Sequence, residues 1–130
     1  MKLPIRISEE SREPIYHQIE TQIKALIVGG QIAPGTPLPS IRILASDLAC
    51  SVITTRKAYQ NLENGGFIKT VQGKGTFVNE VERETTDRTK KKVVHDGFQK
   101  VMIQGKQLGF SEEELRSIFN DVLLELHDDQ

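Results

Sequence analysis

The sequence predicts a mainly α-helical chain with one small β-hairpin, and three observations support this prediction. Apolar residues recur at helical spacing on two short segments between residues 41 and 62, separated by a short break. Two segments rich in β-branched and aromatic residues, 67–71 and 76–78, then flank a glycine-containing turn. Helical spacing resumes over residues 94–126. Spacings of three and four residues indicate amphipathic helices, whereas short branched and aromatic runs around glycines indicate a hairpin.

The first helix of the pair is predicted to begin after Ser40, whose hydroxyl can accept hydrogen bonds from first-turn amides, and Pro39 favours an extended approach. Its buried face consists of Ile41, Leu44, Ala45 and Leu48, and Ala49-Cys50-Ser51 makes the turn. Ser51 then caps a second helix, which Gly65-Gly66 ends. That helix turns Thr55, Ala58, Tyr59 and Leu62 inward and Val52, Ile53, Arg56, Lys57 and Gln60 outward.

The hairpin, residues 67–78, carries Gln72-Gly73-Lys74-Gly75 at its tip. The glycines permit the positive φ angles of a tight turn, which leaves Lys74 exposed. A phosphate-binding loop of a nucleotide enzyme is the alternative, but it requires a longer glycine spacing followed by Ser or Thr and a helix. Two helices joined by a short turn and followed by a hairpin are typical of a winged helix-turn-helix, a fold that binds duplex DNA.

The outward face of the second helix has the chemistry of a DNA-reading surface. Arg56 can form two hydrogen bonds with guanine, Val52 or Ile53 can contact a thymine methyl group, and Thr54 can bond a phosphate. An ordinary solvated helix face is the simpler interpretation. Two β-branched residues in the first turn, where a recognition helix meets base edges, favour DNA contact.

The residues before the helix pair are predicted to complete its core. Pro14 suits the first position of a helix with the apolar stripe Ile15, Ile19, Ile23 and Ile27, which Gly29-Gly30 ends. Residues 31–39 form a turn and an extended connector. Residues 5–7 form either a short strand or a frayed segment.

Residues 80–130 have a different character. Residues 79–92 are charged and form either a linker or the start of a long helix. The stripe from Val94 is interrupted by Gly97 and Gly105, which weaken a helix or mark the close approach of a neighbour. Ser111 and Glu114 form a capping box for a last helix. Two helices cannot bury both stripes alone, so we predict a homodimer. The predicted dimerisation residues are Phe98, Val101, Met102, Leu108, Leu115, Ile118, Phe119, Val122 and Leu126.

Composition and charge fit this division into a DNA-binding domain at 1–79 and a helical dimerisation region at 80–130. The net charge of the 130 residues is −1. Residues 1–79 carry nine Lys or Arg and six Asp or Glu, a net of +3, whereas residues 80–130 carry eight and twelve, a net of −4. The acidic part should therefore face away from DNA.

Other protein classes are disfavoured. No run of about 18 apolar residues and no signal peptide is present, so we expect a cytoplasmic protein that does not enter the membrane. One cysteine excludes an internal disulfide, and Cys50 is expected to pack rather than to sense redox state. His17, His95 and His127 lack a metal-ligand spacing, and no catalytic signature is present. We therefore expect no enzyme, no metal and no cofactor.

The spaced motifs together resemble the GntR family of bacterial transcription regulators over residues 11–79. They are 14–19 (PIYHQI), Pro34-Gly35, 38–42 (LPSIR), Leu44-Ala45, Ser51, Thr54, Ala58-Tyr59, Leu62-Glu63, Gly66 and 73–78 (GKGTFV). The resemblance implies that Arg42, Arg56, Gln72, Gly73 and Lys74 contact DNA, with Ser40, Ser51 and Thr54 near phosphates. The family usually has arginine or another polar residue where this chain has Val52.

The short helical tail resembles that of the YtrA-type branch, whose members typically repress neighbouring transporter genes. Two helices leave no room for a separate ligand-binding domain. We therefore predict a homodimeric repressor whose Ser51–Lys57 segment reads each half of an inverted-repeat operator. The alternatives are a winged-helix module that binds a protein, or a small-molecule sensor with weak DNA affinity. The predicted DNA-binding residues are Ser40, Arg42, Ser51, Val52, Ile53, Thr54, Arg56, Lys57, Gln72, Gly73 and Lys74.

Overall fold

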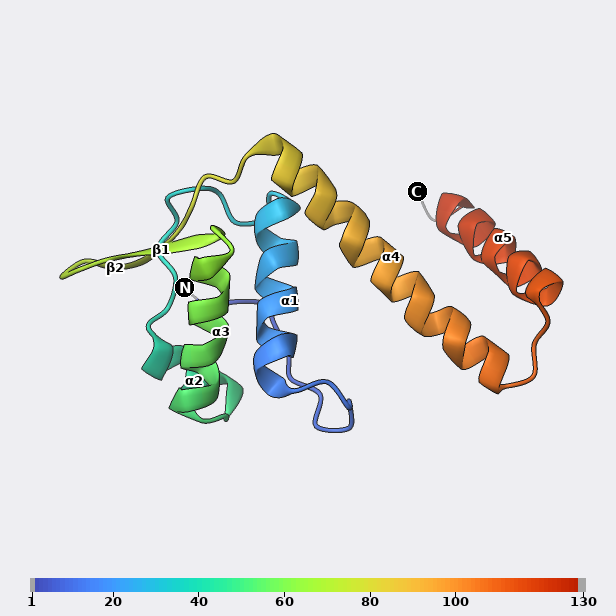
Figure 1. Ribbon diagram of the computed structural model, residues 1–130, viewed down its shortest axis with the longest axis horizontal. Helices are drawn as coiled ribbons and strands as arrows, with labels where there is room; N and C mark the ends of the chain where they lie inside the picture. The colour runs from blue at the N-terminus through green and yellow to red at the C-terminus, as the bar shows by residue number, and fades with distance from the viewer. Residues whose placement is uncertain (1, 129–130) are drawn as a thin grey trace. The chain divides into compact units, whose positions relative to one another are not determined.

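A computed structural model describes residues 2–128 and contains five helices and one two-stranded antiparallel sheet (Figure 1). The described residues form two compact units that meet in sequence between Lys91 and Lys92. The first unit contains α1 (Ile15–Val28), α2 (Ile41–Leu48), α3 (Val52–Asn64), β1 (Ile68–Val71) and β2 (Gly75–Val78). The helix α4 (Arg83–Gln107) continues from the first unit into the second, which also contains α5 (Glu112–Asp128). This element order confirms the predicted mainly helical fold with a small β wing.

The core of the first unit lies between α1 and α3, which run side by side in Figure 1, and α2 packs on α3. Ile19 and Ile23 from α1 and Leu62 from α3 are fully buried. Burying a side chain of this size stabilises a fold by roughly 1.5–3 kcal/mol. The helix predicted to begin at Pro14 therefore is the third helix of this core.

The predicted caps hold the ends of α2 and α3. The Ser40 Oγ accepts from the Ile43 amide at 3.2 Å, and the Ser51 Oγ accepts from the Thr54 amide at 3.0 Å. Ala49 ends α2 with a φ of 55°, in the left-handed region, which turns the chain sharply towards α3. These bonds are local, and they set where each helix begins and ends.

The wing, residues 67–78, gains a third strand-like segment from the connector before α2. In the wing itself, Ile68 pairs with Val78 and Thr70 with Thr76. On the other side of β2, the Leu38 amide donates to the Thr76 carbonyl at 2.8 Å, and the Gly35 amide donates to the Val78 carbonyl at 2.8 Å. Gly73 and Gly75 have φ angles of 82° and 122°, as the predicted turn requires.

The N-terminal arm, residues 3–13, contains no strand at residues 5–7, so of the two interpretations left open for this segment the short strand is wrong. Glutamine amides from α1 take the place of a neighbouring strand. Gln18 accepts from the Ser8 amide at 2.8 Å and donates to the Ser8 carbonyl at 3.1 Å. Gln22 does the same for Arg6, at 2.9 and 2.6 Å. These bonds, with Leu3 and Ile5 buried, fix the arm on α1.

The second unit contains a helical hairpin. The charged segment 79–92 is mostly helical, because α4 begins at Arg83. The predicted capping box is present: Ser111 Oγ accepts from the Glu114 amide at 3.2 Å, and Glu114 Oε1 accepts from the Ser111 amide at 3.0 Å. The Ser111 amide, and after it the Ser111 side chain, hold the pKa of Glu114 below its usual value, because a donor at the carboxylate favours its ionised form.

The two glycines of α4 differ in their surroundings. A Cβ added at Gly105 would lie 2.5 Å from Leu115 Cδ2, so Gly105 allows α5 to approach α4 closely. A Cβ at Gly97 would meet nothing within 4 Å among the described residues. Phe98 and Phe119 add an edge-to-face contact between the helices, with ring centroids 5.5 Å apart. Close approach, one of the two interpretations left open by the sequence, therefore applies to Gly105.

Candidate nucleic-acid interface

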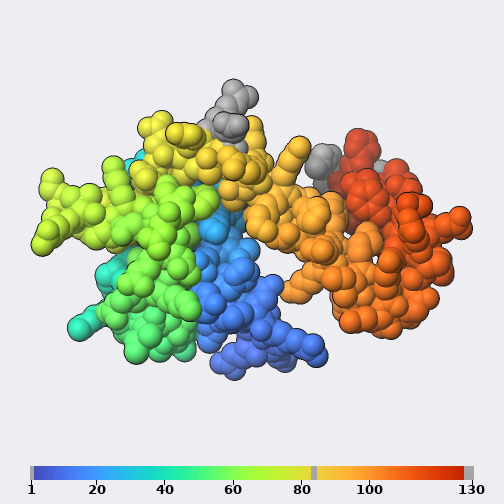
Figure 2. Space-filling view, viewed as in Figure 1, coloured from blue at the N-terminus to red at the C-terminus, as the bar shows by residue number. Residues whose placement is uncertain are grey.

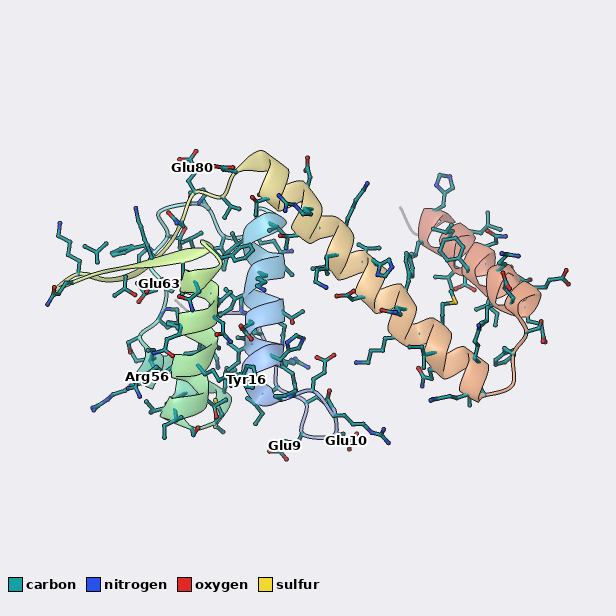
Figure 3. The ribbon with its side chains drawn as sticks, viewed as in Figure 1. Glu9, Glu10, Tyr16, Arg56, Glu63 and Glu80 are labelled. Atoms are coloured by element: carbon teal, nitrogen blue, oxygen red, sulfur yellow. The ribbon has the colours of Figure 1, made fainter. Side chains whose placement is uncertain are left out.

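The N-terminal half of α3 presents an exposed, chemically mixed face. Ile53 is 76% exposed, Arg56 is exposed, and Val52 and Thr54 are half-buried. The opposite face is buried through Thr55, Ala58, Tyr59 and Leu62. Figure 3 shows Arg56 on α3 with its side chain outside the helical core. The helix therefore buries the predicted inward face and leaves the predicted reading face accessible.

The start of α3 contains a polar pair with an unused donor. The Ser51 hydroxyl donates to Thr54 Oγ1 at 2.7 Å while Ser51 Oγ accepts from the Thr54 amide. Because a hydroxyl carries one proton, Ser51 has no further proton to give in this arrangement. The Thr54 hydroxyl proton stays available, and a phosphate oxygen is a suitable acceptor for it.

Three basic side chains of the interface have no bonding partner among the described residues. Arg42, Arg56 and Lys74 are exposed, and their side chains form no ion pair or hydrogen bond with the part of the chain that the structure describes. Unpaired cations at an exposed surface can neutralise phosphates without first breaking an internal bond. Arginine can also donate two parallel hydrogen bonds to guanine.

Lys57 is held differently from these three cations. Its Nζ lies 4.2 Å from the centroid of the Tyr16 ring, which comes from the first turns of α1. Such a cation–π contact restrains the side chain and is worth roughly 0.5–1 kcal/mol at an exposed site. The predicted site residues do not include Tyr16, although it lies in the PIYHQI motif that carries part of the family resemblance. The sequence held no direct sign of this pair, because its members are far apart along the chain.

The wing carries the remaining predicted contacts. Gln72, Gly73 and Lys74 are all exposed, and Figure 2 shows the wing projecting from the surface of the first unit. The α2–α3 turn and the wing lie at opposite ends of α3, which spans roughly 20 Å at 1.5 Å per residue. Ser40, at the start of α2, is exposed like Arg42 but its Oγ serves as a cap. The predicted residues thus lie on α2, α3 and the wing of one unit.

A hollow beside the α2–α3 turn has a volume of about 410 Å³. It is lined by Ile7, Ser8, Glu9, Glu10, Ile15, Leu48, Ala49 and Cys50. Cys50 is half-buried against the core, and its Sγ lies 3.3 Å from Thr55 Oγ1. This packing role is the one that the sequence predicted for Cys50.

Residues 2–128 also bear on two other classes of site. No helix among them is long and apolar enough to span a lipid bilayer. Among the side chains that the structure describes, no group of three or more His, Cys, Asp or Glu is placed to hold a metal ion.

Comparison with known proteins identifies the family of this architecture. The family model for bacterial regulatory proteins of the gntR family matches residues 15–78. The HTH-type transcriptional repressor YtrA of Bacillus subtilis is 33% identical over 118 residues, which cover 91% of each chain.

Solved structures agree with this match. A transcriptional antiterminator from Listeria monocytogenes EGD-e is 30% identical with a TM-score of 0.68, over 94% of this chain and 91% of that one. YtrA from Sulfolobus acidocaldarius, a GntR-family transcription factor, is 35% identical with a TM-score of 0.54, over 95% and 99%. Members of this family are transcription regulators and not enzymes. The chain therefore belongs to the GntR family of bacterial transcription regulators, as a YtrA-like member with a DNA-binding winged helix-turn-helix.

Proposed function

We propose that this regulator is a homodimeric repressor that binds an inverted-repeat operator. One observation carries the proposal: the exposed face of α3 presents Ile53 and an unpaired Arg56 where a recognition helix meets base edges. In the proposed complex, Arg56 bonds guanine in the major groove, and Ile53 contacts a thymine methyl group. Lys74 at the tip of the wing binds phosphate or the minor groove. Because its partner is chromosomal DNA, the proposed location is the cytoplasm.

The contacts with the phosphate backbone would come from the remaining predicted residues. Thr54 has a free hydroxyl proton, and Arg42 is exposed at the start of α2. Ser40 and Ser51 instead contribute by capping their helices, which fixes where α2 and α3 begin. Lys57, held over Tyr16, supplies positive charge at the side of the reading helix.

The proposed dimer is supported by apolar surface that one chain leaves uncovered. Val101 is 57% exposed and Leu126 is 56% exposed, although both belong to the predicted stripes. Other members of those stripes are also exposed: Phe98, Leu108, Ile118 and Val122. Further exposed apolar residues lie outside the list of predicted dimerisation residues: Val94, Ile103, Phe110, Leu123 and Leu124. Of the other three predicted residues, Met102 and Phe119 are half-buried, and Leu115 is buried against Gly105 within the hairpin.

A second copy of α4 and α5 is the occupant that fits this surface best. Exposed apolar area contributes roughly 25 cal/mol for each Å² that is covered, and an apolar patch of this kind is typical of an interaction site. In a two-fold symmetric dimer, each protomer also supplies one reading helix for one half of an inverted repeat. The relative named YtrA is a repressor, which supports the proposed direction of regulation.

The proposal is tested by the affinity of the purified protein for the DNA upstream of its own gene. A scrambled duplex of equal length is the control, and each duplex is titrated at two salt concentrations. We expect preference for the native duplex, two protomers per duplex, and a steep loss of affinity at higher salt. Equal binding to both duplexes would contradict an operator at this position, and no binding to either would contradict the proposed function.

A protein-binding module is the second candidate, and exposed apolar residues on the helix-turn-helix favour it. Ile43 on α2 and Ile53 on α3 are 56% and 76% exposed. A complex with a protein through such residues would be insensitive to salt, whereas contact through Arg42, Arg56 and Lys74 would weaken strongly. The two salt concentrations of the same titration therefore separate the two functions.

A further inference from the structure

The outer edge of the wing is closed by a side chain from the reading helix. The strand β1 pairs with β2 on one side only, so the amides of its other side need different partners. The Thr70 amide donates to Glu63 Oε2 at 2.7 Å. Glu63 lies in the last turn of α3, and Figure 3 shows it beside the start of β1. The bond joins the recognition helix to the wing through a charged acceptor, which makes it stronger than a neutral bond.

This bond lies closer to the wing tip than the other anchors of β1 to the helices. The base of the wing is fixed by buried Phe67 and Ile68 and by Asn79, whose amide donates to the Phe67 carbonyl at 2.9 Å. Beyond Ile68 the strand is exposed or half-buried. Among the described contacts, the bond to Thr70 is therefore the last one that ties β1 to a helix before the turn.

The turn itself transmits the position of β1 to Lys74. The Lys74 amide donates to the Val71 carbonyl at 3.0 Å, and Gly73 and Gly75 hold the left-handed angles of a tight turn. A tight turn of this kind leaves little freedom between the strand and the tip. The direction in which β1 leaves α3, together with the bonds of β2 to residues 35–38, thus decides where the tip lysine lies.

We propose that Glu63 is a positioning residue for the wing, and that its bond to Thr70 sets the place of Lys74 relative to the reading face of α3. This inference rests on the proposed DNA-binding function. A carboxylate at a DNA-binding surface repels phosphates, so its favourable contribution to binding is geometric. Loss of the bond lets β1 bend away from α3, and Lys74 then binds DNA only after the wing is ordered again.

The test compares Glu63→Gln with Glu63→Ala in the full chain. Both changes remove the same negative charge, but glutamine keeps an oxygen that can accept from the Thr70 amide and alanine does not. We expect Glu63→Gln to bind the native upstream duplex at least as tightly as the unchanged protein. Glu63→Ala should bind about three- to tenfold more weakly than Glu63→Gln, the range that one hydrogen bond supplies.

Two further measurements separate positioning from a general loss of stability. In a Lys74→Ala background, the difference between the two Glu63 variants should disappear, because the tip lysine through which Glu63 acts is gone. Exchange of the Thr70 amide with solvent should be faster in Glu63→Ala than in Glu63→Gln without any DNA. Glu80→Ala removes another exposed carboxylate (Figure 3) and serves as the charge control, with no expected loss of binding.

Equal DNA affinity of the two Glu63 variants, or a difference that persists with Lys74→Ala, would overturn the positioning role while leaving the proposed function intact. If the unchanged protein binds neither duplex, the proposed function fails, and with it any DNA role for Glu63. The exchange rate of Thr70 still decides in that case whether Glu63 orders the wing. The two failures are therefore distinguishable.

Discussion

Tyr59→Phe removes one buried hydrogen bond from the first unit and leaves the aromatic ring in place. The Tyr59 hydroxyl donates to the Pro39 carbonyl at 2.6 Å, which ties the middle of α3 to the residue before the cap of α2. The Tyr59 residue is only 4% exposed, and Pro39 is buried as well. Burial raises the pKa of Tyr59, so the phenol stays protonated and donates throughout the physiological range.

The size of the effect follows from this burial. A typical hydrogen bond contributes about 1 kcal/mol net, and a buried acceptor left without a donor costs about 1–3 kcal/mol. No cavity of note forms, because the ring remains. We therefore expect Tyr59→Phe to lower the free energy of unfolding by about 1–3 kcal/mol.

Urea unfolding followed by circular dichroism at one fixed protein concentration measures this change. The urea concentration at the midpoint should fall, while the slope of the unfolding free energy against urea stays the same. The slope depends on the surface that unfolding exposes, and the loss of one hydroxyl hardly changes that surface. Tyr16→Phe is the matched control: the Tyr16 hydroxyl has no hydrogen-bond partner among the described residues, and the ring keeps its contact with Lys57. Equal midpoints for Tyr59→Phe and the unchanged protein, or equal losses in the two variants, would refute the reasoning.

Three other predictions follow from the same structure. Arg56→Ala should weaken binding to the native duplex by about 1–3 kcal/mol and relax the preference for one base pair, and unchanged binding in a titration would show that α3 does not read DNA through this residue. Gly97→Ala should stabilise α4 by up to about 1 kcal/mol, whereas Gly105→Ala should destabilise the hairpin by about 1–3 kcal/mol because the added Cβ would overlap Leu115 of α5. Urea unfolding midpoints that shift in the same direction for both variants would contradict this difference. Leu126→Asp should shift the protein from dimer to monomer in sedimentation at micromolar concentration. Asn120→Asp adds the same charge at another exposed position of α5 and should leave the dimer intact. A dimer that survives Leu126→Asp would exclude this surface as the dimer interface.

Features that depend on neighbouring residues could be predicted from the sequence. Ser40, Ser51 and Ser111 each cap a helix through an amide three residues ahead, so the whole bond lies within one short motif. The buried face of α3 followed from helical periodicity, because one side of a helix must face the core. The family motifs are equally local, which is why the chain could be placed among GntR regulators before its fold was known.

Features that depend on distant residues could not be predicted in this way. Gln18 of α1 accepts from the Ser8 amide of the N-terminal arm, as a neighbouring strand would, and the Lys57 ammonium lies over the Tyr16 ring. Glu63 closes the edge of the wing at Thr70. Polar side chains of these types are most often solvated, and nothing in their own segments distinguishes them from solvated ones. Only the packing of separate elements brings each pair within bonding distance.

Gly97 and Gly105 of α4 show most plainly the difference between what the sequence determines and what the tertiary structure determines. By itself the sequence determined the helices, their caps, the wing and the family, because these depend on spacing and on contacts within a few residues. It placed two glycines in one helix and gave both the same two interpretations. Tertiary structure alone decided between them, since of the two only Gly105 faces Leu115 of α5 so closely that an added Cβ would overlap the leucine side chain. The physical reason is that packing forces act over a few ångströms, and the chain must fold before distant residues come that close.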